Sequence, residues 1–565
     1  MPKKTQVLTE EEQVKELRGL LADDRKWRQL WSEEDSWPEY ERRYRGQFRG
    51  AGVSPVNLYY PFARGTVAQV YFRNPSVTIV DLPPKFTVRA KILEHLDSIL
   101  FSKLRIKSEI KAAAQDIWHC GTGFLVHGYD SEFAFPSLEV KEQNTNIEYN
   151  TGVIPGMPWS LRAHPIDVTV AWGTVSPKSI RRYTIRRARP LDDVKSDSRY
   201  DKKALDALKA GTLESGSFGE KGTAINLKED WVYLYETHDL ARGRMTVTTD
   251  DVDRFLLNQK DELVNVLHGP NITPIVWNAN ASALWGVPDA KILEQDQLTI
   301  NDANTQIINQ LRANLSRFFY NRDAISAEEL SKFLSEQPWV GIAVDGDVDQ
   351  DIKLLTPPNL TGLFSETELL ESRARRTLGY PRTRSGEYTA PTKRVTGKEV
   401  LAVESGAEVG LDEKRDAISD AIIDMVSKWN RLVFNSWDRY RLIFAPDIAP
   451  PISWIAFRGK DLEADYTYRI QPEELQPITT ESRKRDALTI GTMLMKIAGS
   501  LQGIDARSIL RQALRQFPEW DINKVLPPTD QERPELGLVA VLRSDGTLMP
   551  VSKREPSVQQ NATLP

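Results

Sequence analysis

The chain has 565 residues, of which 40% are hydrophobic and 27% charged, and its net charge of −5 excludes recognition of nucleic acid by a generally basic surface. The length is too great for one ordinary core, so we expect two to four domains or one elongated subunit of several parts. A single cysteine, Cys120, excludes an intrachain disulfide framework and a cysteine-based metal cluster, and it fits a reducing compartment.

The N-terminal part, residues 1–56, is predicted to combine a helix with an arm. It opens as MPKKTQVLTEEEQ without an apolar stretch, so no signal peptide is expected. Residues 9–34 are polar with Trp27 and Trp31 four residues apart, which predicts a helix with both rings on one face. Residues 37–52 are basic, aromatic and rich in glycine, a composition that predicts an extended arm.

Residues 57–288 carry helical patterns first and β patterns later. The predicted elements are a short helix from Asn57, a strand after Pro75, helices at about 86–101 and 104–118, strands at 124–130, 159–172, 179–190 and 230–240, and a flexible loop at 213–224. The strands are expected because apolar and polar residues alternate, as they do in strands with one buried face.

The next part, residues 289–317, is predicted to be a long helix with an unusual polar face. Apolar residues recur at helical spacing, whereas the other face carries amides and few charges: Gln295, Gln297, Asn301, Asn304, Gln306, Asn309 and Gln310. Amides offer donors and acceptors without a strong field, so this face suits the wall of a water-filled channel, with Asn304, Gln306, Asn309 and Gln310 as the lining candidates. The alternative is an ordinary surface helix, which usually carries more lysine and glutamate.

Residues 318–360 are predicted to form a small mixed segment before a second helix at 361–379. Its elements are a helix at 326–335 and strands around 341–347 and 351–358. Aromatic residues combined with acidic turns suit a protein interface, and the docking candidates are Phe319, Tyr320, Trp339, Asp345 and Asp347. The run DGDVDQD is interpreted as an acidic hairpin turn, since a calcium loop would need glycine where Gln350 stands.

A loop at 380–397 separates that helix from a proline-free helix at 398–437. Its prolines and glycines disfavour helix continuation. It also carries four cations that could contact DNA phosphates weakly and without sequence preference, namely Arg382, Arg384, Lys393 and Arg394. The alternative is a solvated basic loop that has no partner.

The C-terminal part is predicted to begin with a β-like return at 438–479. Helices at 480–500 and 504–516 lie within a helical part at 480–526. The remaining residues, 527–565, are polar and contain prolines, which predicts a mobile tail.

Motifs for catalysis and cofactor binding are missing from the sequence. It has no GxxxxGK[ST] phosphate loop, no HExxH and no GxSxG. In CGTGFLV (120–126), Val126 stands where a dinucleotide fingerprint needs its third glycine, so Gly121 and Gly123 are interpreted as a helix cap and turn. His119 and His127 are interpreted as core or turn residues. We therefore expect no enzyme activity, no cofactor and no metal, and the lack of a long apolar run predicts no membrane span.

The order of a long amide-faced helix, a small insert, a returning helix, a flexible loop and a very long helix resembles the portal proteins of tailed bacteriophages. The resemblance implies an elongated α+β subunit. Its parts are a wing from 57–288 that returns at 438–479, a stem of two helices at 289–317 and 361–379, a clip at 318–360, a tunnel loop at 380–397, a long wing helix at 398–437 and a helical crown at 480–526.

For function, the resemblance implies a ring of identical subunits, typically twelve, at one capsid vertex of the virion. Double-stranded DNA enters and leaves through its channel, and assembly takes place in the host cytoplasm. The implied partners are the major capsid protein and scaffold, the large subunit of the terminase motor, which docks at the clip, and later head-completion or adaptor proteins.

Two alternative functions stay open at the level of sequence. One is another component of the packaging machinery, such as a terminase subunit, which should carry a phosphate loop. The other is a helical adaptor or scaffold that binds proteins and no DNA.

Overall fold

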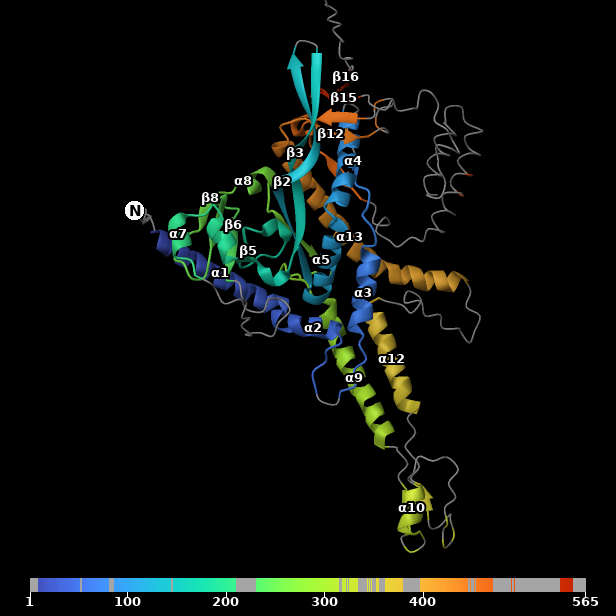
Figure 1. Cartoon of the computed structure of the whole chain (residues 1–565). Helices are drawn as coiled ribbons and strands as arrows, with labels where there is room; N and C mark the ends of the chain where they lie inside the picture. Colours follow the sequence, from blue (N-terminus) through green and yellow to red (C-terminus); the bar gives the residue numbers. More distant parts are fainter. Residues whose placement is uncertain are drawn as a thin grey trace, which may run out of the picture. The chain divides into compact units, whose positions relative to one another are not determined.

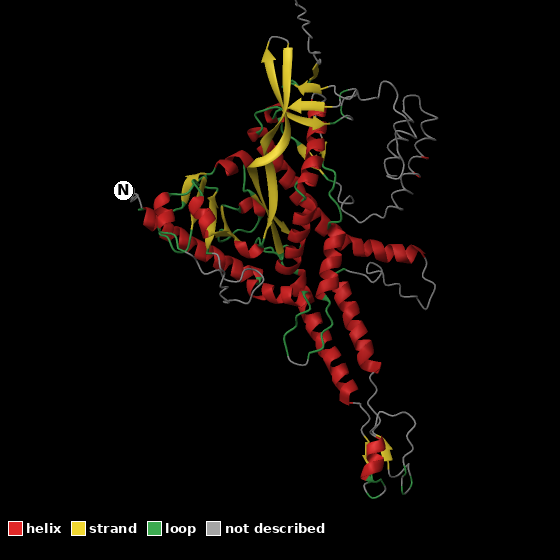
Figure 2. Cartoon of the chain, in the orientation of Figure 1, coloured by secondary structure: helices red, strands yellow, loops and turns green. Residues whose placement is uncertain are grey.

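The computed structural model describes residues 9–50, 53–80, 86–143, 146–209, 230–313, 318–321, 323, 325–333, 343, 345, 347, 352–354, 361–379, 397–445, 448, 452, 454–470, 489, 492 and 539–551. It describes only the backbone of residues 131–143, 146–155, 312–313, 318–320, 333, 352–354, 361–364, 366, 397–409 and 550–551. Helix and sheet are mixed along the chain, as the sequence predicts (Figure 2). Two compact units are present. Unit 1 comprises Met1–Pro38, Ala63–Asp289 and Thr396–Pro565, and unit 2 comprises Glu39–Phe62 and Ala290–Val395.

The helices follow the predicted order (Figure 1). They are α1 (Glu10–Ser32), α2 (Trp37–Tyr44), α3 (Tyr59–Val70), α4 (Thr87–Lys103), α5 (Ile106–Cys120), α6 (Leu191–Ser196), α7 (Lys202–Asp206), α8 (Glu262–Leu267), α9 (Asp289–Ala313), α10 (Ala327–Phe333), α12 (Thr361–Thr377), α13 (Gly397–Ser436) and α14 (Gly459–Leu462). The helices predicted at 9–34, 361–379 and 398–437 are confirmed as α1, α12 and α13, and the helix at 289–317 is confirmed as far as Ala313.

Five antiparallel strands in unit 1 form a sheet in chain order. They are β4 (Val168–Val170), β5 (Arg182–Pro190), β6 (Trp231–Asp239), β7 (Arg244–Thr248) and β8 (Leu257–Lys260). Val232 and Leu234 of β6 are buried together with Val247 of β7 in one apolar cluster that also takes in α6 and α7. Helix α1 contacts β4, so this sheet carries the N-terminal helix.

A second sheet of unit 1 has seven strands in the order β16-β15-β13-β12-β2-β3, with β9 paired to β2. The strands are β2 (Thr122–Gln143), β3 (Asn146–Ala163), β9 (Ile272–Val276), β12 (Arg441–Phe444), β13 (Trp454–Phe457), β15 (Val539–Leu542) and β16 (Leu548–Val551). A short pair, β1 (Thr78–Val80) and β14 (Thr467–Arg469), lies outside it. Helix α13 packs on this sheet because Ile418, Ile422, Met425 and Trp429 recur every three or four residues and are all buried.

The turn between α5 and β2 requires a glycine. Gly121 has a φ of +81°, and a Cβ there would lie 2.0 Å from the carbonyl oxygen of Gly286. Its N–H donates to Ile117 O at 2.8 Å, which closes the last turn of α5. The interpretation of Gly121 as a helix cap is therefore confirmed.

The extended arm predicted at 37–52 is wrong for residues 37–44, which form α2. Two of the aromatic residues in this stretch, Trp37 and Tyr40, are buried, so the helix has an apolar face. Glu39 pairs with Arg42 and Arg43, three and four residues later, which supports the helix. The prediction of an arm rested on composition and did not consider the helical spacing of these residues.

The mobile tail predicted at 527–565 is wrong for residues 539–551, which add β15 and β16 to the seven-stranded sheet. All four residues of β15 are buried. The connection contains Asp545 and Gly546, with a φ of +86° at the glycine, and an Asp-Gly pair between two apolar runs is a strong hairpin signal. The described residues do not include the rest of this tail or the loop predicted at 213–224. They include only residues 489 and 492 of the helices predicted at 480–500 and 504–516.

Unit 2 contains α9, α10 and α12 together with a small antiparallel pair, β10 (Phe318–Tyr320) and β11 (Ile352–Leu354). The partner predicted for the strand at 351–358 was a strand at 341–347. That pairing is wrong, because β11 pairs with β10 and the described residues Ala343, Asp345 and Asp347 lie in no strand. Of the acidic run at 345–351 only Asp345 and Asp347 are described, so the predicted hairpin turn lies largely outside the described residues.

Candidate functional site

Helices α9 and α12 lie side by side in unit 2 (Figure 1) and are joined by an ion pair. Asp296 of α9 accepts from Arg373 Nε of α12 at 2.8 Å, and the Asp296 side chain is almost fully buried. The apolar residues Leu293, Ile300 and Ile307 of α9 and Leu370 and Ala374 of α12 are buried as well. A second pair, Arg43 with Glu294 at 3.0 Å, ties α2 to α9.

One face of α9 holds the backbone of residues 54–58 through polar side chains. The contacts are Gln297 Nε2 to Val56 O (2.6 Å), Leu58 N to Gln297 Oε1 (2.9 Å), Val56 N to Asn301 Oδ1 (3.0 Å), Asn304 Nδ2 to Ser54 O (2.7 Å) and Ser54 N to Thr305 Oγ1 (3.1 Å). Residues 297, 301 and 304 are four and three apart, so one side of the helix offers amides in a row to an extended segment.

The expectation that all seven amides of α9 face solvent is therefore wrong for Gln297 and Asn301, which are buried. Asn304, a channel-lining candidate, is half-buried and is committed to Ser54. Amides serve here because each can satisfy both an N–H and a C=O of a buried backbone segment.

Replacing Gln297 by alanine should release residues 54–58 from α9. The change leaves the Leu58 N–H and the Val56 carbonyl without their partner, at about 1–3 kcal/mol for each buried group. Hydrogen exchange of the Leu58 amide should rise at least about tenfold. Gln306→Ala, at an exposed position of the same helix, should leave the exchange unchanged, and equal behaviour of the two variants would contradict the assignment.

The opposite side of α9 keeps the remaining amides at the surface. Gln306 and Asn309 are exposed and Gln310 is half-buried. Gln295, also exposed, lies eleven residues before Gln306, which is about three helical turns. Three of the four channel-lining candidates thus lie on a polar surface stripe.

Large apolar side chains are exposed on the same two helices. On α9, Ile292, Leu298 and Leu311 are 37%, 42% and 50% exposed, and on α12 Leu369 is 62% exposed. Single exposed leucines are common, but four within one helix pair offer apolar area to a neighbouring molecule.

The docking candidates of residues 318–360 are placed in part. Phe319 pairs with Lys353 and Tyr320 with Ile352 in the β10–β11 register. Asp345 and Asp347 are exposed. Trp339 lies outside the described residues, as do all four cations of the 380–397 loop, Arg382, Arg384, Lys393 and Arg394.

His127 and His119 are buried, which confirms the interpretation of both as core residues. His127 shares hydrogen bonds with Ser160 (2.7 Å) and Thr273 (2.8 Å), and burial and the Lys428 cation hold the pKa of its imidazole well below its usual value. In the described part of the chain, no three His, Cys, Asp or Glu side chains gather as metal ligands would, and no helix is long and apolar enough to cross a membrane.

Two features of unit 1 were not predicted from the sequence. One is a groove of about 970 Å³ lined by β9 and by Asp420, Asp424 and Lys428 of α13. The other is a buried triad in which His238 lies 2.6 Å from Asp261 and 3.1 Å from Glu236 and stacks on Tyr183. The groove joins residues that are far apart along the chain, and in the triad Asp261 lies 23 residues after His238, so no local sequence pattern marks either feature.

Stability of the five-stranded sheet should fall as the pH rises through about 9. Burial alone would lower the pKa of His238, but hydrogen bonds to Asp261 and Glu236 raise it to about 9. Because the folded pKa exceeds the unfolded value of about 6.5, this stabilisation is complete below pH 6.5 and lost above pH 9, and it amounts to roughly 3 kcal/mol. Melting temperatures from pH 6 to 10 should drop more steeply for the wild type than for His238→Gln, and parallel curves would contradict the assignment.

No protein-family model and no curated protein sequence matches the chain.

Proposed function

We propose that the chain is the portal protein of a tailed bacteriophage. Identical subunits, twelve in the typical arrangement, form a ring at one capsid vertex of the virion, and double-stranded DNA passes through its channel during packaging and ejection. The observation that carries the proposal is the succession of α9, the β10–α10–β11 segment, a helix α12 that is bonded to α9, and the 40-residue helix α13.

In this proposal the elements have distinct tasks. Helices α9 and α12 are the stem, and the exposed amides Gln306 and Asn309, with the half-buried Gln310, face the channel. Amides contact water and passing DNA without a strong field, which suits a duplex that has to slide. Residues 380–397 are the tunnel loop, whose cations touch phosphates.

The exposed leucines Leu298, Leu311 and Leu369 support assembly into a ring. A helix pair with apolar residues on its outer side stabilises itself by covering them with a neighbour, and a closed ring covers them on every subunit.

The proposed portal has different partners during capsid assembly, DNA packaging and head completion. The major capsid protein and scaffold surround it during assembly in the host cytoplasm. The large subunit of the terminase binds the clip, residues 318–360, and supplies ATP hydrolysis, and head-completion proteins later take the same place. The chain itself is proposed to act as a channel and docking protein and not as an enzyme.

Negative-stain microscopy of the purified protein is the deciding experiment. Rings with a central hole are expected. A monomer that hydrolyses ATP would favour a terminase subunit, and a protein that forms no ring and gives no DNA passage would favour an adaptor or scaffold. Either result would overturn the proposal.

Docking at the clip should depend on its acidic residues. Asp345 and Asp347 are exposed, so changing both to lysine should cost little folding energy but reverse the local charge that a motor subunit meets. Terminase binding should weaken at least about tenfold in a pull-down with intact rings. Asp302→Lys, an exposed acidic position on α9, is the control and should bind normally. Unimpaired binding by the double variant would refute the assignment.

A further inference from the structure

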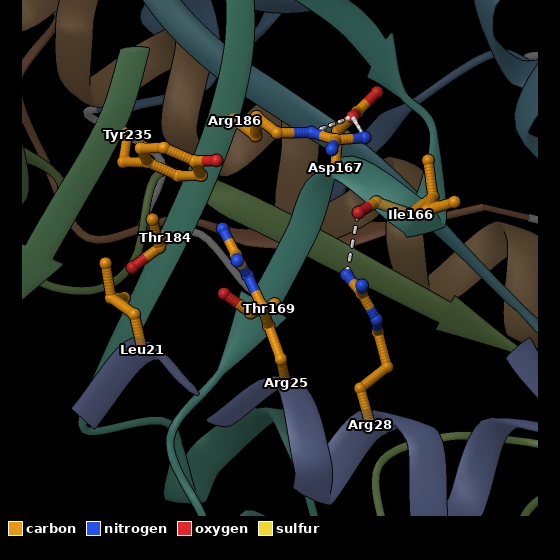
Figure 3. A pocket seen from close by; sticks show the side chains of 9 residues that line it. All are labelled: Leu21, Arg25, Arg28, Ile166, Asp167, Thr169, Thr184, Arg186 and Tyr235. Atoms are coloured by element: carbon orange, nitrogen blue, oxygen red, sulfur yellow. Dashed lines mark hydrogen bonds and ion pairs between the residues drawn. The ribbon is translucent and has the colours of Figure 1, made fainter. Parts of the chain in front are cut away.

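Three guanidinium groups converge between α1 and the five-stranded sheet (Figure 3). Arg25 and Arg28 come from adjacent turns of α1, and Arg186 comes from β5. Figure 3 shows Arg25 rising from α1 past Thr169, with Thr184 and Tyr235 to its left. Its guanidinium lies 5.0 Å from the centre of the Tyr235 ring.

Two of these three cations are neutralised by carboxylates. Arg28 is buried, bonds Glu34 at 2.9 and 3.1 Å, and also donates to the carbonyls of Ile166 (2.7 Å) and Val168 (2.9 Å). Arg186 pairs with Asp167 at 2.7 Å.

Arg25 differs from both of its neighbours. Among the described residues, no carboxylate forms an ion pair with it. The lining therefore contains one guanidinium without a direct ion pair, at a place where Arg25 is half-buried and water screens it less than at the open surface. The Asp250 carboxylate is engaged by the hydroxyl of Tyr235 at 2.9 Å.

These groups surround a cavity of about 30 Å³. Its lining includes the hydroxyl-bearing side chains of Thr169 and Thr184, both buried, and the apolar side chains of Leu21 and Ile166. A cavity of this size holds one small ion or one or two waters, and it is about ten times smaller than sites for cofactors.

We infer that this cavity binds one small monovalent anion of the size of chloride. The Arg25 guanidinium supplies the charge, the Arg186 guanidinium and the threonine hydroxyls supply further N–H and O–H donors, and the volume excludes larger anions. The bound ion offsets the repulsion among the three cations and so fastens α1 to β4 and β5. The inference is independent of the proposed portal function, because it concerns only how α1 is held.

Thermal unfolding in matched salts tests this site. At a fixed ionic strength of about 0.15 M, sodium chloride or bromide should raise the melting temperature by roughly 2–4 °C over sodium gluconate, whose anion is too large for the cavity. Arg25→Met should abolish that difference. Lys26→Met, which removes an exposed cation one position away, should keep it. The same melting temperature of the wild type in all three salts would overturn the inference.

A second measurement needs no variant and locates the ion. Crystals of the wild-type chain grown in bromide should show an anomalous peak between Arg25 and Arg186. A cavity that holds water only, or bromide peaks confined to exposed lysines and arginines elsewhere, would overturn the proposal even if the melting temperature responded to the salt.

Discussion

Changing Leu298 and Leu369 together to lysine should convert the proposed ring into monomers of 64.1 kDa. Both leucines are exposed, Leu298 on α9 at 42% and Leu369 on α12 at 62%, so the isolated subunit loses little stability when they change. Burying a leucine in an interface contributes about 1.5–3 kcal/mol, and a ring repeats this gain at every contact. Lysine at both positions removes the gain and adds charges that an apolar interface disfavours.

Multi-angle light scattering checks this result, with circular dichroism to show that the monomer is folded. The matched control is Gln306→Lys with Asn309→Lys, which adds the same two charges on the amide stripe of α9. The control should still form rings. Rings of unchanged size from the leucine variant would show that these side chains do not lie between subunits.

Replacing the four cations of the 380–397 loop by alanine should impair the handling of DNA and leave ring assembly intact. Arg382, Arg384, Lys393 and Arg394 would each make a weak, screened contact with a phosphate, under about 1 kcal/mol, but the proposed ring of twelve would carry many of them. Packaging should slow, or packaged DNA should slip back. The effect should be the same for any DNA sequence, because phosphate contacts carry no base information.

The deciding measurement is the length of DNA retained in capsids that carry the quadruple variant. The defect should shrink at high salt, where the wild-type contacts are already screened. Wild-type length and retention at low and moderate salt would mean that these cations do not touch DNA and that the loop is simply solvated. A variant with four exposed lysines of unit 1 replaced instead, at Lys91, Lys178, Lys195 and Lys202, controls for lost charge.

Local periodicity made the helices predictable. The capping box of Thr9 and Glu12 and the apolar spacing of α9 and α13 act within a few residues along the chain, so sequence alone specifies where these helices run. Composition was not sufficient for the short helix α2. Its basic and aromatic residues predicted an extended arm, whereas their spacing is that of a helix.

The tertiary structure decided which segment each polar side chain or strand contacts. Gln297 and Gln306 are the same residue type on the same helix, yet one holds the backbone of residues 54–58 and the other faces solvent. The helical pattern specifies that they lie on different sides of α9, but only the folded chain shows which side meets another segment. The folded chain also decided two strand pairings that the sequence did not predict. Strand β10 pairs with β11, and β15 and β16 join the seven-stranded sheet.

The sequence by itself determined the succession of elements, because hydrogen bonds within helices and alternation within strands depend on near neighbours. The tertiary structure alone decided the buried polar contacts: the Asp296–Arg373 bond, the His238 triad, and the three arginines beside α1 join residues 77, 23 and about 160 positions apart. Such contacts leave no local pattern, since a buried charge needs its partner in space and not in sequence.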